Sequence, residues 1–189
     1  MWVVQNDAVS ASKKLCFKST EKPDAVLKLL REYGSYGCSS YSPKLSVKWP
    51  DVLSACPSKT LLPKLEFFQS IGVPLPVLAQ KLSVYPFVLR RSLKNSLIPS
   101  HNDLKSLLGS DERVVDVFSR NPRCFDASSN ISMLRERGVP ESSIVSVVMY
   151  QPSLLVLARE KLSAYVDRAF SMGFDISKRA FITAVRVFL

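Results

Sequence analysis

The stretch Pro86-Phe87-Val88-Leu89 decides the fold, because variants of it recur along the chain at nearly constant spacing. Each variant has a proline followed by mostly apolar side chains; they are Pro50-Asp51-Val52-Leu53, Pro122-Arg123-Cys124-Phe125 and Pro152-Ser153-Leu154-Leu155. Successive prolines are 36, 36 and 30 residues apart. Self-similarity at a fixed period of about 20 to 50 residues is typical of solenoids and repeat arrays.

A glycine precedes each of these prolines by 13 to 16 residues, and one more glycine begins a further unit. These glycines are Gly34, Gly72, Gly109, Gly138 and Gly173. Apolar residues spaced three and four apart precede most of them, as in Leu61 to Ile71 before Gly72. This pattern predicts a half-buried helix that ends at a glycine in the left-handed conformation.

A second helix is expected between each glycine and the next proline, because the residue before a proline avoids the helical conformation. After Gly138, Pro140 suits the first turn and Ile144 begins the apolar stripe, while Ser110 or Asp111 is expected to cap the helix after Gly109. The four residues from each proline predict one 3-10 turn. The sequence thus predicts an all-α solenoid, right- or left-handed, without a sheet and with its prolines at helix ends.

The predicted array covers residues 21–189, with an irregular, turn-rich stretch at 35–49 and a shorter third unit. Residues 1–20 are a separate N-terminal segment with three lysines and one acid. Two interpretations stay open for it: a remnant of an organelle-targeting peptide, or a frayed helix before the first unit.

The charge balance favours a polyanionic partner. The chain carries 26 Lys and Arg against 16 Asp and Glu, a net charge of +10, and most of that excess lies in residues 1–94. Basic proteins of this kind commonly bind nucleic acid, although solubility or a basic targeting remnant explains the charge as well.

Several other classes of protein are not expected. The four cysteines are Cys16, Cys38, Cys56 and Cys124; no two of them have zinc-ligand spacing, and His101 is the only histidine. They are expected to be reduced and to lie in apolar or small-residue positions. No catalytic grouping or phosphate-binding loop is found, so we expect no enzyme, no metal and no cofactor. No run of 18 apolar residues occurs, so no membrane partner is expected.

The order of these motifs resembles the mitochondrial transcription termination factor (mTERF) family, especially its plant branch. The resemblance rests on Lys59 to Val73, on Tyr85 to Leu89, on Gln151 to Leu155 and on Gly173 to Leu189. It covers about residues 21–189; the recurrence carries it rather than any single motif. The departures are the stretch 35–49, the short third unit and an end partway through a unit, so the chain looks like a truncated member.

The resemblance implies a left-handed superhelical stack of three-helix units with a basic concave face. Family members bind nucleic acid in mitochondria or plastids and act in transcription, transcript maturation or translation. The resemblance therefore implies double-stranded DNA binding in the regulation or termination of organellar transcription. The alternatives are RNA binding in transcript maturation or splicing, and a helical scaffold that binds proteins.

Basic side chains near the proline turns and in the last helix are the candidate contacts. They are Arg90, Arg91, Lys94, Arg120, Arg123, Arg159, Lys161, Lys178, Arg179 and Arg186. Recurrence at one phase of the repeat would place them on one side of the array, where they could follow a phosphate backbone. The alternative is an ordinary solvated face in which acids are mixed with the bases.

Aromatic and apolar residues complete the predictions. The phenylalanines of the apolar stripes are expected in the core; they are Phe67, Phe68, Phe118, Phe170, Phe181 and Phe188. Trp49, Tyr85 and Tyr150, just before the turn prolines, are expected to cap the core between units, although stacking on bases is an alternative. The last residues, Val187-Phe188-Leu189, predict an exposed apolar end through which chains self-associate.

Overall fold

The computed structural model describes residues 21–34, 52, 55–176 and 178–188. They divide into two compact units, one ending at Leu93 and the other beginning at Lys94, a division that the sequence does not predict. Within the described residues every regular element is a helix and there is no β-strand, so the predicted all-α class is confirmed. The predicted stretches 1–20 and 35–49 lie outside these residues.

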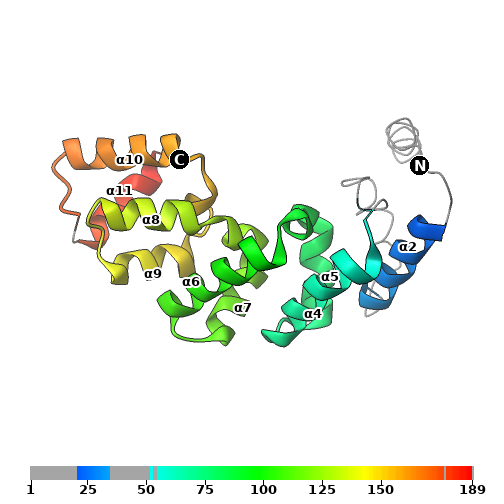
Figure 1. Ribbon diagram of the computed structural model, residues 1–189. Coiled ribbons are helices and arrows are strands. Elements are labelled where there is room, and N and C mark those ends of the chain that lie inside the picture. The colour runs from blue at the N-terminus through cyan, green and yellow to red at the C-terminus, as the bar shows by residue number, and fades with distance from the viewer. Residues whose placement is uncertain (1–20, 35–51, 53–54, 177, 189) are drawn as a thin grey trace. The chain divides into compact units, whose positions relative to one another are not determined.

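The first unit contains three α-helices, α2 (Glu21–Gly34), α4 (Leu62–Ser70) and α5 (Leu75–Val84) (Figure 1). A π-helical turn, η2 (Pro57–Leu61), leads directly into α4, and the 3-10 turn η3 (Pro86–Arg90) follows α5. Helix α2 packs against α5 and against η2.

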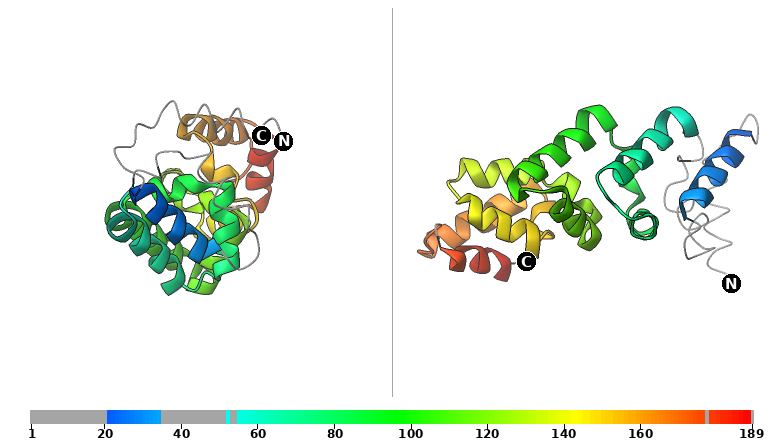
Figure 2. Two further views of the ribbon diagram at one scale, coloured as in Figure 1. Left: turned by 90° about the vertical axis from the view of Figure 1, so that its right-hand side faces the viewer. Right: turned by 90° about the horizontal axis from the view of Figure 1, so that it is seen from below.

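The second unit continues the same order of elements. It follows the π-helical turn η4 (Leu93–Leu97) and consists of α6 (Ile98–Leu108), α7 (Asp111–Arg120), η5 (Pro122–Asp126), α8 (Ser128–Glu136), α9 (Glu141–Tyr150), η6 (Leu154–Val156), α10 (Arg159–Ser171) and α11 (Arg179–Val187). Helix α8 lies beside α9 and α10, and α11 packs against both α9 and α10 (Figure 1 and Figure 2). Five of the ten candidate residues, from Arg159 to Arg186, lie on α10 and α11 or at the N-cap of α11.

The glycine prediction is confirmed at four positions. Gly72, Gly109, Gly138 and Gly173 each follow a helix and have φ between 79° and 94°. At such a φ an L side chain is strained, whereas glycine is not, so the glycine ends the helix and lets the chain reverse. Gly34 is the last residue of α2.

The prediction for the proline motifs is also confirmed. No helix runs through Pro86, Pro122 or Pro152, and a 3-10 turn begins at, or two residues after, each of these prolines. The first motif lies mostly outside the described residues, although Val52 within it is buried. Ser110 is the N-cap of α7, where its hydroxyl accepts a hydrogen bond from the Arg113 backbone N–H. Pro140 is the N-cap of α9 rather than part of its first turn.

Two prolines correct the prediction that prolines stand at the ends of helical stretches. Pro63 and Pro99 are the second residues of α4 and α6, and each α-helix directly continues a π-helical turn. A proline has no N–H to donate, and its ring crowds the carbonyl four residues earlier. The wider π turn accommodates it: the N–H of Leu62 bonds the carbonyl of Pro57, five residues back.

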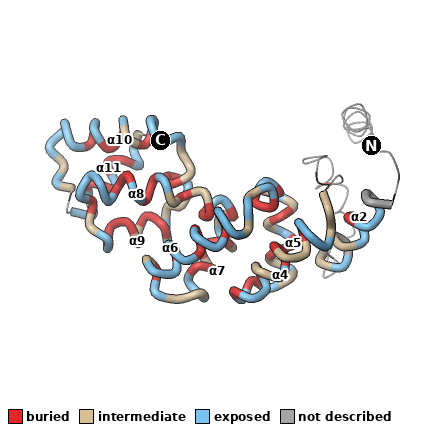
Figure 3. Tube along the Cα trace, viewed as in Figure 1, coloured by how far each residue is buried: buried red, intermediate tan, exposed pale blue. Residues whose placement is uncertain are grey.

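The core follows the predicted stripes with one clear exception. Phe68, Phe118 and Phe181 are fully buried, and Figure 3 shows buried and exposed positions alternating along the helices. Phe67 and Phe188 are half-buried. The prediction that Phe170 is a core residue is wrong, because its side chain is 65% exposed. Val166 and Ala169 supply the buried face of α10, and Phe170 is rotated about 100° from Ala169, away from that face.

Buried polar side chains join the first helix of a pair to the next 3-10 turn. The Lys64 ammonium donates a hydrogen bond of 2.5 Å to the carbonyl of Leu89. The Asn130 amide donates bonds of 2.9 Å to the carbonyls of Leu155 and Leu157. Hydrogen bonds as well as apolar contacts therefore hold the 3-10 turns against the helices.

Candidate nucleic-acid interface

Two of the ten predicted contact residues, Arg90 and Arg91, lie in the first unit. Arg90 is the last residue of η3, is exposed, and places its guanidinium over the ring of Phe87, 5.7 Å from the centroid. Stacking on a ring face leaves the N–H edge of a guanidinium available to a phosphate. Arg91 follows the turn and is half-buried.

The arginines around η5 bind carbonyl groups of the protein. Arg120, the last residue of α7, donates from Nη1 to the carbonyl of Met149 at 2.7 Å and from Nη2 to Asp116 at 2.8 Å. Arg123 donates from Nη2 to the carbonyl of Val156 at 3.2 Å. Each guanidinium thus satisfies a carbonyl at the end of a later element, a role that the sequence does not reveal.

Arg159 has a similar linking role. Its Nη1 donates to the carbonyl and the hydroxyl of Ser129, at 2.9 and 3.1 Å, and its Nη2 lies 3.0 Å from the carboxylate of Glu136. Arg137, which the sequence did not single out, also binds Asp167 and Ser163. These bonds join α8 to α10.

The remaining candidates of α10 and α11 have weaker partners. Lys161 lies over the ring of Tyr165, 5.6 Å from the centroid, and Lys178 is 3.7 Å from the carboxylate of Asp175. The side chain of Arg179 lies outside the described residues. Within the described part of the chain, the exposed residues Lys94 and Arg186 have no carboxylate within ion-pair distance.

Arg186 lines a pocket that the sequence analysis did not anticipate. The pocket measures about 250 Å³, and its other walls are Tyr150, Gln151 and Ser153. A second pocket of about 160 Å³ shares Tyr150 and Gln151 and continues to Ser143. Both lie where the C-terminal end of α9 meets α11, within the second unit.

Tyr150 corrects the prediction that the aromatic residues before the prolines cap the core. Its side chain is 72% exposed. Tyr85 is half-buried and lies 5.8 Å from the ring of Phe87, and Trp49 lies outside the described residues. The stripe of α9 consists of Ile144, Val147 and Val148, and Tyr150 falls two residues beyond it, on another side of the helix. The exposure of Tyr150 could therefore have been predicted from the helical period of the sequence.

The structure brings two of the predicted cations to the same helix end. Arg120 binds the Met149 carbonyl in the last turn of α9, and Arg186 lines the pocket beside Tyr150. Cations are favourable there, because the last carbonyls of a helix carry partial negative charge. The sequence predicts that Arg90, Arg91, Arg123 and Arg159 share one face. The first two lie in one unit and the last two in the other, so this stays a prediction.

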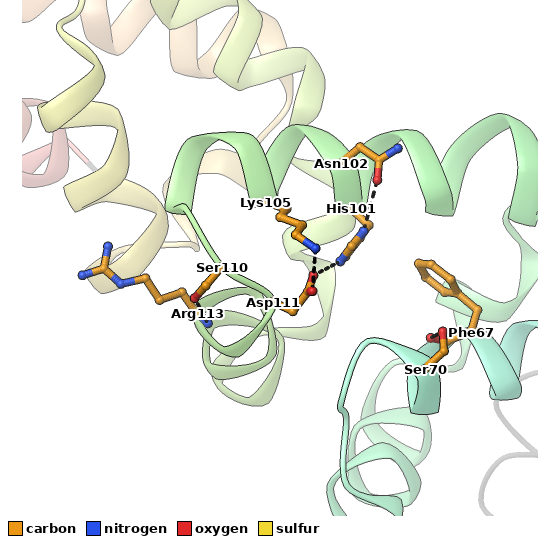
Figure 4. A network of polar contacts seen from close by, with 8 residues as sticks. All are labelled: Phe67, Ser70, His101, Asn102, Lys105, Ser110, Asp111 and Arg113. Carbon is orange, nitrogen blue, oxygen red and sulfur yellow. Dashed lines mark hydrogen bonds and ion pairs between the residues drawn. The ribbon is translucent and has the colours of Figure 1, made fainter.

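A polar network joins α6 to α7 around the turn at Gly109 (Figure 4). Buried His101 places its Nε2 2.8 Å from one carboxylate oxygen of Asp111, and Lys105 places its Nζ 2.6 Å from the other. The Lys105 ammonium, followed by the His101 imidazole, holds the pKa of Asp111 below its usual range. These contacts link α6 to the first turn of α7 across the turn at Gly109.

The cysteines and acids complete the inventory of reactive groups. Burial raises the pKa of the Cys124 thiol well above its usual range. Cys56 is half-exposed, and backbone N–H groups led by that of Lys59 lower the pKa of its thiol. Among the residues that the structure describes, no three His, Cys, Asp or Glu side chains come together as metal ligands. No helix of that same part is long and apolar enough to cross a membrane.

Comparison of the chain with protein-family models, with curated proteins and with solved structures gave no match. The resemblance to the mTERF family therefore rests on the sequence motifs themselves.

Proposed function

We propose that this chain binds nucleic acid through contacts to phosphates, as an mTERF-like protein that regulates or terminates transcription in an organelle. The observation that carries the proposal is the net charge of +10. A protein with such an excess attracts polyanions, and cations on turns and helix ends can reach a phosphate backbone. Duplex DNA is the expected target because of the family resemblance.

The repeated architecture supports the fold that this function needs. Helix, left-handed glycine, helix, proline and 3-10 turn follow one another in the same order around Gly72, Gly109 and Gly138. Regular recurrence of one supersecondary element lets neighbouring units stack into a solenoid with an extended surface. We take the left-handed superhelix and its basic concave face as part of the proposal.

The candidate cations divide into two groups under this proposal. Arg90, Lys94 and Arg186 are exposed and have no carboxylate partner among the described residues, so they are the primary phosphate contacts. Arg120 and Arg159 already bind protein groups. A guanidinium has five N–H donors, so these two arginines keep donors for a phosphate while they hold the helices together.

Fluorescence anisotropy with a labelled duplex, a single-stranded DNA and an RNA of equal length tests the proposal. We expect duplex affinity to fall steeply between 50 and 200 mM salt, because binding releases counterions. Reversing Arg90 and Arg91 to Glu should lower the log–log salt slope by about 1.8, since each phosphate contact contributes about 0.9.

A matched control reverses two exposed lysines of the same unit, Lys28 and Lys59, and so changes the net charge equally. We expect this control to keep more of the salt slope than the arginine variant. Equal losses in the two variants would show that only net charge matters. Absence of binding to all three nucleic acids at 50 mM salt would overturn the proposal, and preference for RNA would move it to transcript maturation.

A further inference from the structure

The pocket between the end of α9 and α11 combines three features of different chemistry. One wall is an aromatic ring, that of Tyr150; one is a guanidinium, that of Arg186; and one is an amide, that of Gln151. The neighbouring pocket shares Tyr150 and Gln151 and is also lined by the buried hydroxyl residue Ser143. An aromatic ring, a guanidinium and an amide around one pocket are not explained by packing of the hydrophobic core.

The exposure of Tyr150 points to a ligand rather than to a core contact. Large aromatic side chains are strongly driven out of water, and this one is 72% exposed on a helix whose apolar stripe, Ile144, Val147 and Val148, is buried. A rigid ring at the mouth of a pocket offers a flat face on which another ring can stack. Stacking of this kind binds nucleobases regardless of their sequence.

Gln151 supplies the second observation. Its Oε1 is fully buried, and no described residue donates a hydrogen bond to it. A buried acceptor without a donor is costly, and native structures contain few of them. Gln151 lines both pockets, and a change of its side-chain rotamer turns this oxygen toward them, where a ligand that carries an N–H group can satisfy it.

Arg186 supplies the charge. It is exposed, lines the same pocket and has no carboxylate partner among the residues described. Arg120 also lies at this helix end, bound to the Met149 carbonyl, but Asp116 balances its charge, so Arg186 is the cation left for a ligand. The ligand that matches the site therefore has a flat ring, an N–H edge and a negative charge.

We propose that this pocket binds one unpaired nucleotide. The base stacks on Tyr150, an N–H of the base edge donates to Oε1 of Gln151, and the phosphate binds Arg186. The inference rests on the proposed function in that the nucleotide belongs to a nucleic acid, and it adds to the duplex contacts a separate site for an unpaired base. A base within a duplex has its N–H edge paired and its faces stacked, so it cannot occupy the pocket.

The site is tested with the full chain by NMR, using uridine 5′-monophosphate as the probe. We expect it to shift the backbone amide signals of Tyr150, Gln151 and Arg186. Ribose 5-phosphate lacks the base, and the N3-methyl derivative of the probe lacks the N–H donor, so both should bind at least several-fold more weakly. Equal binding of all three compounds, or shifts spread over the whole basic surface, would overturn the inference.

Substitutions of Tyr150 test the same site on a polymer. Tyr150→Ala should weaken binding of single-stranded RNA or DNA by about tenfold, while Tyr150→Phe should retain it and duplex affinity should not change. Phe170→Ala removes another exposed ring of the second unit and should have no effect. A Tyr150→Ala variant that binds single strands as the wild type does, or that loses duplex and single strand equally, would contradict the proposal.

The two proposals can fail separately. Salt-dependent duplex binding without shifts at Tyr150 would leave the proposed function and remove the nucleotide site. Shifts at Tyr150 with the mononucleotide, together with no salt-dependent binding to any polymer, would keep the site and remove the proposed function.

Discussion

Asn130 and Leu155 are joined by a buried hydrogen bond of 2.9 Å from the side-chain amide to the backbone carbonyl, across 25 residues of chain. Lys64 and Leu89 repeat this relationship at the same separation of 25 residues. Ser100, the buried residue 25 positions before Phe125, instead accepts a hydrogen bond from the Ser128 hydroxyl at 3.2 Å. One position of the repeat thus holds a buried polar side chain of variable chemistry.

Removing the Asn130 amide should destabilise the second unit. Asn130→Leu leaves the Leu155 and Leu157 carbonyls buried without these donors, so we expect the free energy of unfolding to fall by about 1–3 kcal/mol. Urea denaturation followed by circular dichroism measures this loss. Ser132→Ala, at an exposed position of the same helix, is the control and should change stability by less than about 0.5 kcal/mol. A neutral Asn130→Leu would show that these bonds do not stabilise the unit.

Lys64 should make stability depend on pH in the alkaline range. Desolvation lowers the pKa of its ammonium below the usual 10.5, so the folded chain releases this proton at a lower pH than the unfolded chain. Between the two pKa values the unfolded state binds more protons, and stability therefore rises with pH up to about 10.5. Urea unfolding from pH 7 to 11 should show this rise for the wild type and lose part of it for Lys64→Met. Identical slopes would contradict the burial of a charged Lys64.

Gly138 should tolerate asparagine better than valine. Its φ is +79°, and an added Cβ would meet no atom within 4 Å, so the cost of a substitution comes from the backbone conformation alone. We expect Gly138→Val to lose about 2 kcal/mol or more, and Gly138→Asn to lose less, because asparagine enters the left-handed region more readily. Thermal unfolding of the two variants gives the comparison. Equal stability of the valine variant and the wild type would argue against the left-handed turn.

Asp111 should link stability to acid pH. Lys105, and then His101, lower the pKa of its carboxyl below the usual 3.8. This contribution to stability is therefore fully present above about pH 4 and is lost as the pH falls through the lower, folded-state pKa. Asp111→Asn should reduce stability at pH 7 and flatten its acid dependence in urea titrations from pH 2 to 7. Asp103→Asn, at an exposed position of α6, should leave that dependence unchanged.

The predicted self-association stays a prediction, and the described residues make it testable. Val187 is 77% exposed, whereas Phe181 and Val185 of the same helix are buried. We expect Val187→Ser to reduce any concentration-dependent increase in size seen by light scattering. A size that does not change with concentration in the wild type would contradict self-association.

The sequence by itself determined the helices and the points where they end. Glycine alone adopts a positive φ without strain, and proline prevents the preceding residue from continuing a helix, so Gly109 and Pro122 specify boundaries locally. Apolar spacing likewise identified Phe68, Phe118 and Phe181 as core, because the helical period fixes which side chains share a face. The sequence did not predict the π turns before Pro63 and Pro99, because a helical stretch can accommodate a proline by a kink, by a break or by a wider turn.

Only the tertiary structure decided which polar groups meet. Arg120, Arg123 and Arg159 look alike in the sequence, yet each binds a carbonyl 29 to 33 residues away or on another helix, according to where its neighbouring element lies. The pocket of Tyr150, Gln151 and Arg186 likewise depends on α11 returning beside α9. Such contacts come from the distances between helices, whereas sequence periodicity fixes only the face on which a side chain lies.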